Sequence, residues 1–392
     1  MPTQFEKFVP GEEMAKLKPT SPETKEPLEL TKEQDEHFIG LLQKAKQVEK
    51  QGDLEQAIKL FQQYKEEYQA LREEKKAKDF EKEGLEALPQ KEIKEQYESQ
   101  KEIFEKNGIL EKLSSGEMGI KGIDDKEYAF PKIEEISKMM RENQEILKTK
   151  IEQGFTKLLI VPFGMKLDDL IERYKQVILK HHKAGKLLAT KKDPSEKDDK
   201  LELDKKEPVY VSDEYKNADT NGKLVYYPKE FSKENHQGKT KEEILEKTKQ
   251  GFNILLIEDL PNIPREGKGQ EVGGRKQFET NKTPNEYLEA LQTESIYQNE
   301  QGLTPEDQIA YAILHLEQTN QVIDDYYSGN GSISYQLGAF FFASGFVPSA
   351  YWGRRAYWGR DLRQACLYGG DPGDRDGNSG ARSAVRVSDF DI

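Results

Sequence analysis

The distribution of lysine divides this chain of 392 residues into two parts and constrains its fold more than any linker does. Of its 60 basic residues, 12 are arginine and 48 are lysine, and the last lysine is Lys282. The 110 residues after it contain seven of the arginines, both tryptophans and the only cysteine, Cys366. We therefore predict that a separate C-terminal domain begins near Lys282 and covers residues 283–392.

The composition excludes several classes of protein. Hydrophobic residues make up 34% of the chain and charged residues another 34%, which excludes a large membrane bundle, and no apolar run is long enough to span a bilayer. The single cysteine excludes a disulfide framework and a multi-cysteine metal site. The first residues lack the basic and apolar order of a secretory signal. We expect a cytoplasmic protein by default, with export by another route left open.

The N-terminal part is predicted to be helical after a polar beginning. Residues 1–35 carry five prolines among charged residues, which predicts a disordered arm. Residues 36–150 are predicted to be a helical region. Apolar residues recur at intervals of three and four over 38–48 and again over 54–71, and Gly52 and Asp53 lie between the two runs. This spacing predicts two amphipathic helices joined by a tight turn.

The middle of the chain, residues 151–265, is predicted to be a small α/β domain. Short apolar runs typical of buried strands occur at 158–161, 209–211, 224–227 and 254–257, and helical spacing occurs over 167–178. Residues 266–282 are rich in glycine and charge but lack the order of a phosphate-binding loop. We predict that they form a linker.

The C-terminal domain is predicted to combine a capped helix, short strands and a long loop. Thr304 can cap a helix that begins at Pro305 and runs to about Asn320. Residues 381–387 alternate as a strand does. Residues 349–380 are rich in glycine, aspartate and serine and contain a near-duplication, Tyr-Trp-Gly-Arg at 351–354 and at 357–360. This segment predicts a long functional loop, because tyrosine, arginine and small polar residues are typical of binding surfaces.

The residues that could carry chemistry do not form a catalytic or metal-binding pattern. The five histidines have no metal-ligand spacing. Asp371, Asp374 and Asp376 with Gly377 suggest a calcium loop, but the EF-hand spacing fails, which favours a polar turn. Cys366 has no candidate base at motif spacing. We predict no catalytic residue, no metal and no cofactor.

The C-terminal residues resemble a known family. The motifs that carry the resemblance are Gly-Leu-Thr-Pro-Glu-Asp at 302–307, Ser-Gly-Phe-Val-Pro at 344–348, Ala-Tyr-Trp-x-Arg at 350–354, Arg-Gln-Ala-x-Leu at 363–367 and Gly-Ala-Arg-Ser-Ala-Val-Arg-Val at 380–387. They are similar to motifs of the variable proteins of diversity-generating retroelements, whose C-terminal domain has a C-type lectin fold like that of formylglycine-generating enzymes. The match covers roughly 290–387 and is most specific over 344–387. The wider chain also resembles uncharacterised proteins of candidate-phylum bacteria.

The resemblance implies a mechanism of diversification and a division of the site residues. In this family a reverse transcriptase copies a template with errors at adenines, so that some codons vary while codons lacking adenine stay fixed. The implied ligand-binding, variable positions are Ser349, Tyr351, Gly353, Tyr357, Gly359, Cys366, Tyr368, Gly369, Gly370, Asp371, Gly373, Asp374, Asp376, Gly377, Asn378 and Ser379. The implied fixed scaffold positions are Trp352, Trp358, Arg360, Arg363, Pro372, Arg375, Gly380, Arg382 and Arg386.

Two departures from the family pattern limit the transfer. The six-residue duplication is not part of that pattern, so either Tyr351 or Tyr357 could hold the usual site. The Glu-Pro-Asn and Trp-Asn-Asp signatures of calcium-dependent lectins are absent, so sugar binding through calcium is not implied. We also expect Arg382 and Arg386 to attach the last strand to acidic or carbonyl partners.

The sequence as a whole predicts an α+β, non-enzymatic protein that binds a ligand through the variable surface. Tyrosine and arginine with small polar residues favour a protein surface as the ligand. One alternative is nucleic-acid binding, with bases stacked on Trp352 and Trp358 beside Arg354, Arg355, Arg360 and Arg363. The net charge of -13 disfavours it. The other alternative is an enzyme of the formylglycine-generating type, against which the lone cysteine argues. The oligomeric state and the work of residues 36–260 are left open.

Overall fold

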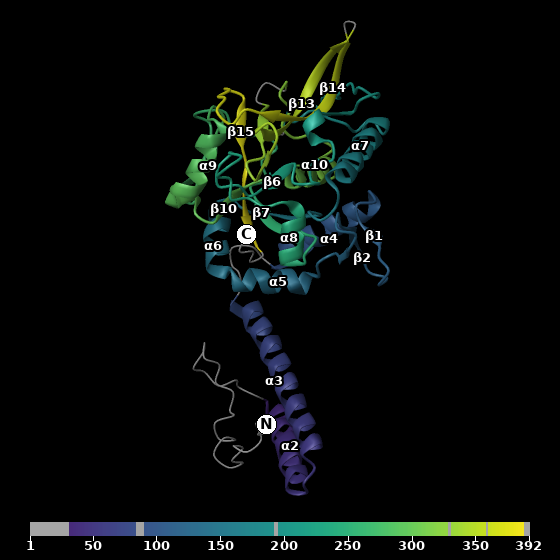
Figure 1. The fold of residues 1–392 in the computed structure, drawn as a ribbon, viewed down its shortest axis with the longest axis vertical. Coiled ribbons are helices and arrows are strands. Elements are labelled where there is room, and N and C mark those ends of the chain that lie inside the picture. The colour runs from purple at the N-terminus through teal and green to yellow at the C-terminus, as the bar shows by residue number, and fades with distance from the viewer. Residues whose placement is uncertain (1–30, 84–89, 192–194, 328–330, 358–359, 388–392) are drawn as a thin grey trace. The chain divides into compact units, whose positions relative to one another are not determined.

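The computed structural model describes residues 31–83, 90–191, 195–327, 331–357 and 360–387. The chain forms two compact units, Met1–Gly84 and Leu85–Ile392. Unit 1 is helical, and unit 2 combines helices with several small sheets, which confirms the predicted α+β class (Figure 1). In the described ranges, no helix has the length and apolar character needed to cross a bilayer.

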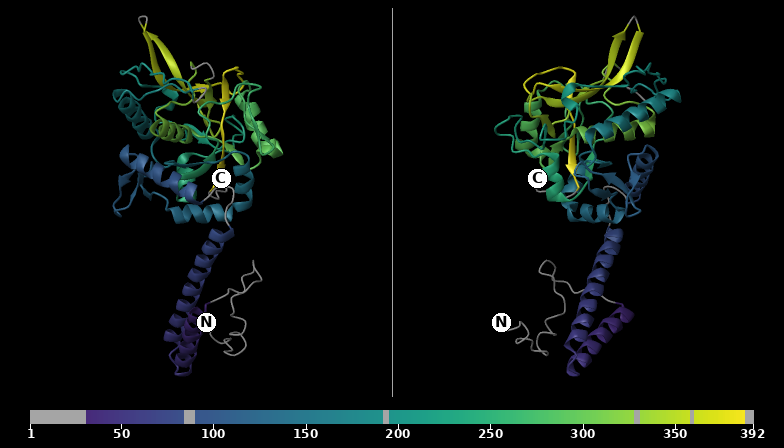
Figure 2. Two further views of the ribbon diagram at one scale, coloured as in Figure 1. Left: turned by 180° about the vertical axis from the view of Figure 1, so that it is seen from behind. Right: turned by 45° about the vertical axis from the view of Figure 1, so that its right-hand side comes forward.

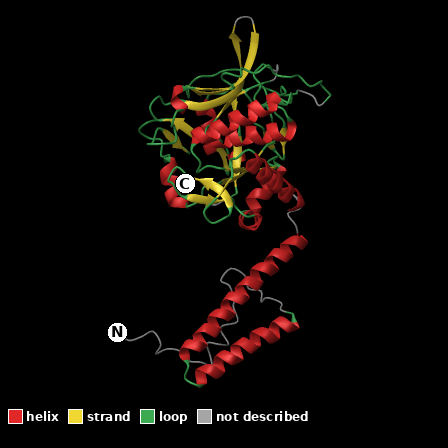
Figure 3. Ribbon diagram, turned by 90° about the vertical axis from the view of Figure 1, so that its right-hand side faces the viewer, coloured by secondary structure: helices red, strands yellow, loops and turns green. Residues whose placement is uncertain are grey.

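Unit 1 is a hairpin of two helices, α2 (Lys32–Lys50) and α3 (Leu54–Glu83), as the apolar spacing predicts (Figure 3). A capping box begins α2, because the Thr31 side chain accepts a hydrogen bond from the Gln34 N–H and the Gln34 side chain accepts one from the Thr31 N–H. The ring of Phe38 packs edge-on against Tyr64 and Tyr68, with centroids 5.5 and 5.4 Å away. The predicted disordered arm is wrong for residues 32–35, which are helical, and residues 1–30 lie outside the described ranges.

A small antiparallel sheet interrupts the region that was predicted to be helical up to residue 150. Its strands have the order β1-β2-β3, and along the chain they follow helix α4 and precede helices α5 and α6. Glycine explains the change, because Gly108 and Gly116 adopt positive φ angles of 66° and 87°, which favour turns over a continuing helix. The bounds are α4 (Gln90–Lys106), β1 (Glu111–Lys112), β2 (Met118–Lys121), β3 (Glu127–Ala129), α5 (Ile133–Glu142) and α6 (Gln144–Glu152).

A four-stranded antiparallel sheet joins the predicted middle and C-terminal domains. Its order is β10-β16-β7-β4, with β4 (Lys157–Val161), β7 (Asn253–Ile257), β10 (Glu300–Gly302) and β16 (Ser383–Arg386). All five residues of β7 are buried, and β7 pairs on one edge with β4 and on the other with β16. The predicted boundaries at 151, 265 and 283 therefore do not separate folded units. The two predicted domains differ in lysine content, but both contribute strands to the same sheet and therefore to the same core.

A five-stranded sheet carries the segment that was predicted to be a long loop. Its order is β15-β11-β13-β14-β5, with β5 (Val209–Val211), β11 (Ile333–Tyr335), β13 (Val347–Tyr357), β14 (Arg360–Gly370) and β15 (Ser379–Ala381). The loop prediction is wrong for 349–357 and 360–370, because these residues form a long antiparallel hairpin in continuous register. The hairpin extends beyond the rest of unit 2 (Figures 1 and 2). Among the described residues of the predicted loop, only 371–378 connect strands as a turn-rich segment.

Helices pack around these sheets and fix the hairpin in place. The helix α10 (Pro305–Thr319) confirms the predicted cap, because Thr304 Oγ1 accepts from the Asp307 N–H at 3.2 Å and Asp307 Oδ2 accepts from the Thr304 N–H at 2.8 Å. It packs against α7, β4 and β13. The remaining bounds are α7 (Leu167–Lys183), α8 (Lys241–Thr248), α9 (Pro284–Thr293), the short helices η1 (Asp213–Tyr215) and η2 (Ser295–Tyr297), and the paired strands β6 (Leu224–Tyr226) and β12 (Ala339–Phe341).

The predicted linker, residues 266–282, is part of the folded unit. It contains the hairpin of β8 (Glu271–Val272) and β9 (Arg275–Lys276). Arg275 is fully buried, and its guanidinium donates to both carboxylate oxygens of Glu300, at 2.7 and 2.8 Å, and to Glu258 at 3.1 Å. A buried arginine requires acidic partners such as these. Because both partners lie outside residues 266–282, the composition of this segment gives no sign of the ion pairs, and it therefore predicted a linker.

Candidate ligand-binding face

The hairpin of β13 and β14 sorts its residues onto two faces of the sheet. Successive side chains of a strand point to opposite sides. Tyr351 lies opposite Cys366, and Ser349 lies opposite Tyr368, so these four residues share one face, which we call the tyrosine face. By the same register Gly353 and Gly370 belong to it. Trp352, Ala350, Arg363, Ala365 and Leu367 belong to the opposite, inner face.

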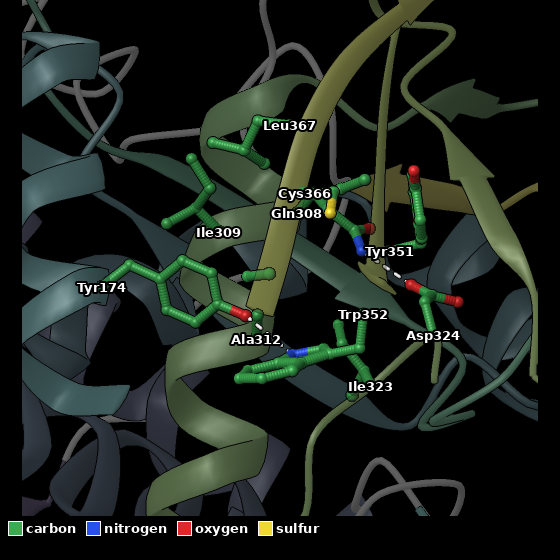
Figure 4. Close-up of a pocket in the computed structure, with 12 residues that line it drawn as sticks. Tyr174, Gln308, Ile309, Ala312, Ile323, Asp324, Tyr351, Trp352, Cys366 and Leu367 are labelled. Atoms are coloured by element: carbon green, nitrogen blue, oxygen red, sulfur yellow. Dashed lines mark hydrogen bonds between the residues drawn. The ribbon is translucent and has the colours of Figure 1, made fainter. Parts of the chain in front are cut away.

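The inner face is fixed by packing around Trp352. This side chain is 1% exposed, and its indole Nε1 donates a hydrogen bond to the hydroxyl of Tyr174 in α7 at 3.3 Å (Figure 4). Beside it lies a cavity of about 20 Å³, lined also by Gln308 and Asp324, which has room for about one water and not for an organic ligand. The inner face is therefore structural, as the scaffold role implied for Trp352 requires.

A continuous row of tyrosines crosses the tyrosine face and the edge beside it. Neighbouring ring centroids are 4.7 Å apart for Tyr210 and Tyr368, 6.3 Å for Tyr368 and Tyr351, 6.1 Å for Tyr351 and Tyr326, and 4.9 Å for Tyr326 and Tyr327. Tyr368 is 38% exposed and Tyr327 is 46% exposed, and the other three are half-buried. We call these five residues the tyrosine row.

The rings at both ends of the tyrosine row already have partners on their faces. Tyr210 and Tyr368 stack on each other at an interplanar angle of 24°. The guanidinium groups of Arg354 and Arg363 lie 5.8 and 5.3 Å from the ring centre of Tyr327. Burial and the hydrogen bond to Tyr210 raise the pKa of Tyr368 to about 12, and burial raises the pKa of Tyr351 as well. Both phenols are neutral at physiological pH and can donate and accept hydrogen bonds.

Several small residues that were predicted to contact a ligand are buried instead. Ser349 and Cys366 are each 5% exposed, Ser379 is 2% exposed, and Gly353 is buried. A Cβ atom added to Gly353 would lie 2.6 Å from the Cys366 Sγ and 3.0 Å from the Tyr351 ring. The assignment of these four as ligand-contacting positions is therefore corrected, because all four are buried, and Gly353 and Cys366 lie against the ring of Tyr351.

The surroundings of Gly369 and Gly370 also differ from what a ligand-contacting position requires. Both are half-buried, and Gly369 belongs to the inner face by its register with Pro348. A Cβ atom at Gly369 would lie 2.7 Å from the Glu214 carboxylate, and one at Gly370 would lie 3.1 Å from the ring of Tyr335. Glycine is used at both positions because neighbouring side chains approach the backbone closely.

The polar segment after the hairpin contributes exposed positions next to the tyrosine row. Asp371, Gly373, Asp374 and Gly377 are exposed, and Asp376 and Asn378 are half-buried. Asp376 accepts hydrogen bonds from the Ser379 N–H at 3.0 Å and hydroxyl at 2.7 Å, and the Asn378 Nδ2 donates to the Tyr326 hydroxyl at 3.4 Å. Within the described ranges, no three His, Cys, Asp or Glu side chains are grouped so that they could hold a metal ion.

Arg382 attaches the end of the chain to the core, as expected from the sequence. Its side chain is 7% exposed, and its two Nη atoms donate to the two carboxylate oxygens of Asp324 at 2.7 and 2.8 Å. It also donates to the backbone carbonyls of Leu260 and Pro261 at 3.1 Å. The Asp324 carbonyl in turn accepts from the Trp352 N–H at 2.8 Å, so Arg382 and Trp352 hold the same segment.

The other scaffold positions have more varied surroundings. Arg363 pairs with Asp325, and Arg375 pairs with Glu286 although both side chains are exposed. Arg386 donates to the side-chain oxygens of Gln301 and Asn253 at 3.3 and 3.4 Å. The Pro372 carbonyl accepts from the Asn285 N–H at 3.1 Å, and a Cβ atom at Gly380 would lie 2.8 Å from Ile263. Trp358 and Gly359 lie outside the described residues, and only the backbone pairing of Tyr357 with Arg360 is described.

Sequence reasoning missed three members of the tyrosine row. Tyr210 lies in the predicted strand 209–211, which pairs in parallel with β14 and places Tyr210 beside Cys366. Tyr326 and Tyr327 begin the uncharged run before β11, and the Tyr326 N–H donates to the Trp352 carbonyl at 3.3 Å. Their two-tyrosine run was a visible signal, but no local pattern indicates which strands become neighbours.

Comparison with known proteins adds no relative to this geometry. The chain matches no family model, no curated protein and no solved structure.

Proposed function

We propose that this chain is a non-enzymatic binding protein that contacts its ligand through the tyrosine row and the polar segment 371–378. We further propose that unit 2 contains a C-type lectin-like domain whose ligand-contacting positions are diversified by a retroelement reverse transcriptase. The observation that carries the proposal is the division of the hairpin: Tyr351 and Tyr368 of the implied variable set lie on the tyrosine face, with Gly369 as an exception on the inner face, and Trp352 and Arg363 of the implied scaffold set lie on the inner face.

The physical basis is the two-residue period of a strand. Side chains on one face can change while those on the other keep the hairpin packed, so recognition can vary without loss of the fold. Tyrosines combine a large apolar area with a hydroxyl and lose little conformational entropy on binding, which suits a protein surface as the ligand. The exposed aspartates 371 and 374 add charged contacts at the rim.

Two alternatives from the sequence lose support. A base cannot stack on Trp352, because this side chain is 1% exposed and its indole N–H donates a hydrogen bond to the Tyr174 hydroxyl. Burial raises the pKa of the Cys366 thiol to about 11, so the only cysteine is a neutral thiol and a poor nucleophile at physiological pH. We therefore propose neither nucleic-acid binding nor formylglycine-type chemistry.

Sequencing the 3′ third of the gene from many cells of one population tests the diversification. We expect codon differences at Tyr351, Tyr368 and positions 371, 373, 374, 376, 377 and 378, with Pro372 and Arg375 constant, associated with a nearby reverse-transcriptase gene and a near-copy template. Codons for Trp352 and Arg382 should be constant. The codons of α10 serve as the internal control, and differences spread equally over α10 and the tyrosine face would contradict the proposal.

Display of a library on yeast tests the binding capacity directly. The full chain is displayed with residues 351, 368, 371 and 374 randomised, and a matched library randomises the inner-face positions 350, 352, 365 and 367. We expect the first library to display as well as the parent and to yield binders to a probe protein such as lysozyme. Equal loss of display in both libraries would refute the assignment of the face.

A further inference from the structure

A large groove lies along strand β10, on the four-stranded sheet and away from the tyrosine row. Its volume is about 970 Å³, and its walls come from α6, α9, β10 and the segment 227–229. The labels of α6 and α9 lie on either side of that of β10 in Figure 1. A volume of this size exceeds what one or two waters fill and is in the range of ligand sites. We call it the edge groove.

The edge groove exposes one side of an edge strand. In the sheet order β10-β16-β7-β4, β10 is the last strand, and β16 is the one strand that pairs with it in the described part of the chain. Backbone N–H and C=O groups on the second side of such a strand can accept another strand. At its far end Gly302 lies against Leu337 and Gly338, so the groove meets the strand at Gln301, which is half-buried, and at Glu300, which is 8% exposed.

Gln301 supplies a polar group that needs a partner. Its Oε1 accepts a hydrogen bond from the Arg386 Nε at 3.3 Å. A guanidinium can only donate, so this contact fixes which end of the amide faces Arg386. The Nε2 is consequently directed elsewhere, is buried, and has no hydrogen-bond partner among the described residues. A carbonyl or carboxylate oxygen of a ligand would satisfy it.

The chemistry of the walls indicates which ligand fits. Ile146 of α6 is 39% exposed although it is apolar, and Leu288 and Leu291 of α9 line the other wall. Lys229 and Arg386 contribute positive charge. Glu300 points into the core, where Lys150 and Arg275 bind its carboxylate, both at 2.7 Å. The lining also contains the amide side chains of Asn143, Gln237, Gln292 and Asn299, so the groove is cationic and largely polar, with apolar contacts from Ile146 and from the 9% exposed edges of the two leucines.

We propose that the edge groove binds an extended, acidic peptide segment of a partner protein, which adds as a strand to β10. Apolar side chains at alternate positions of the peptide pack against Ile146 and the two leucines, and its backbone pairs with the one of residues 300 and 301 whose N–H and C=O point away from β16. Its acidic side chains lie near Lys229 and Arg386. This mode of recognition uses backbone hydrogen bonds for affinity and alternate side chains for selectivity.

Selection from a random nonapeptide phage library on the immobilised full chain tests the proposal. Enriched peptides are synthesised with a fluorescent label, and their affinity is measured by anisotropy. We expect enrichment of peptides with alternating apolar and acidic residues. Methylation of alternate backbone nitrogens, which removes donors from strand pairing, should weaken binding at least tenfold.

Matched variants locate the binding. Ile146→Glu and Gln301→Ala should each weaken binding at least fivefold, whereas Phe342→Glu changes a side chain of the same 39% exposure outside the groove and should have no effect. The circular dichroism spectrum of each variant checks its fold. Absence of any enriched peptide, or peptides insensitive to both groove variants, would overturn the proposal. Peptides lost with Tyr368→Ala alone would also overturn it while supporting the tyrosine row, so the two proposals fail separately.

Discussion

Replacement of Arg382 by alanine is the most direct test of the buried contacts that hold Asp324 and Trp352 in place beside the tyrosine row. In Arg382→Ala, the carboxylate of Asp324, a residue that is 1% exposed, loses two hydrogen bonds of 2.7 and 2.8 Å, and the Leu260 and Pro261 carbonyls lose their guanidinium donors. Removal of one partner of a buried ion pair costs about 3–5 kcal/mol, because the other charge stays buried.

The remaining contacts of Asp324 set the expected value near the lower end of that range. Its carboxylate still accepts from the Gln308 Nε2 and the Ser332 hydroxyl, both at 2.8 Å. We therefore expect the free energy of unfolding to fall by about 3 kcal/mol. Tyr368→Ala, on the exposed face, should lower it by only about 1 kcal/mol, mainly through its stacking on Tyr210.

Urea denaturation followed by tryptophan fluorescence measures both values. The two tryptophans, Trp352 and Trp358, belong to unit 2, so the signal reports that unit. The double variant Arg382→Ala with Asp324→Asn removes the uncompensated charge and should lose less stability than the two single changes added together. The reasoning is refuted if Arg382→Ala costs less than about 1 kcal/mol, or no more than Tyr368→Ala.

Three further predictions concern buried positions of unit 2. Gly353→Ala should lower the free energy of unfolding in urea by about 1–3 kcal/mol, because the added Cβ atom would meet Cys366 and Tyr351. In the control Gly377→Ala the added Cβ atom meets nothing within 4 Å, so the free energy of unfolding should change by less than about 0.5 kcal/mol. Equal effects of the two changes would contradict the packing around Gly353. Burial raises the pKa of Asp307 from 3.8 to about 7, so the unfolded chain ionises first and the native state loses up to ~4 kcal/mol of stability as pH rises from 4 to 7. Asp307→Asn should remove this loss. The prediction is refuted if the free energy of unfolding, measured in urea, differs between pH 5 and pH 8 by the same amount in the parent chain and in Asp307→Asn. The Cys366 thiol, 5% exposed, should react with a disulfide reagent at pH 8 at least about a hundredfold more slowly in the native chain than in urea, and comparable rates would show that it is not covered.

Local patterns predicted the individual elements well. The runs at 158–161, 209–211, 224–227 and 254–257 correspond to β4, β5, β6 and β7 with differences of at most one residue at either end. The cap at Thr304 and the turn at Gly52 were also visible. These features depend on residues close together in sequence, where propensity, capping and burial period act directly.

The arrangement of those elements could not be predicted from the same patterns. The pairing of β16 with β7 joins residues about 130 positions apart, and the ion pair of Arg275 with Glu300 binds the predicted linker into the core. The hairpin of β13 and β14 was missed because its glycines, read as loop residues, mark close approaches to Cys366, Glu214 and Tyr335. Long-range pairing selects such residues by the space available, and composition does not report that space.

The same close approaches limit how freely a diversified surface could vary. Tyr351 rests against Gly353, and a Cβ atom at that glycine would already lie 3.0 Å from its ring. A large side chain at 353 therefore requires that residue 351 become small or move. Positions 351 and 353 should consequently vary as a coupled pair, while Tyr368, which lies opposite the small Ser349, should vary more independently. The number of usable surfaces is then set by the packing between neighbouring positions and is smaller than the product of the choices at each position.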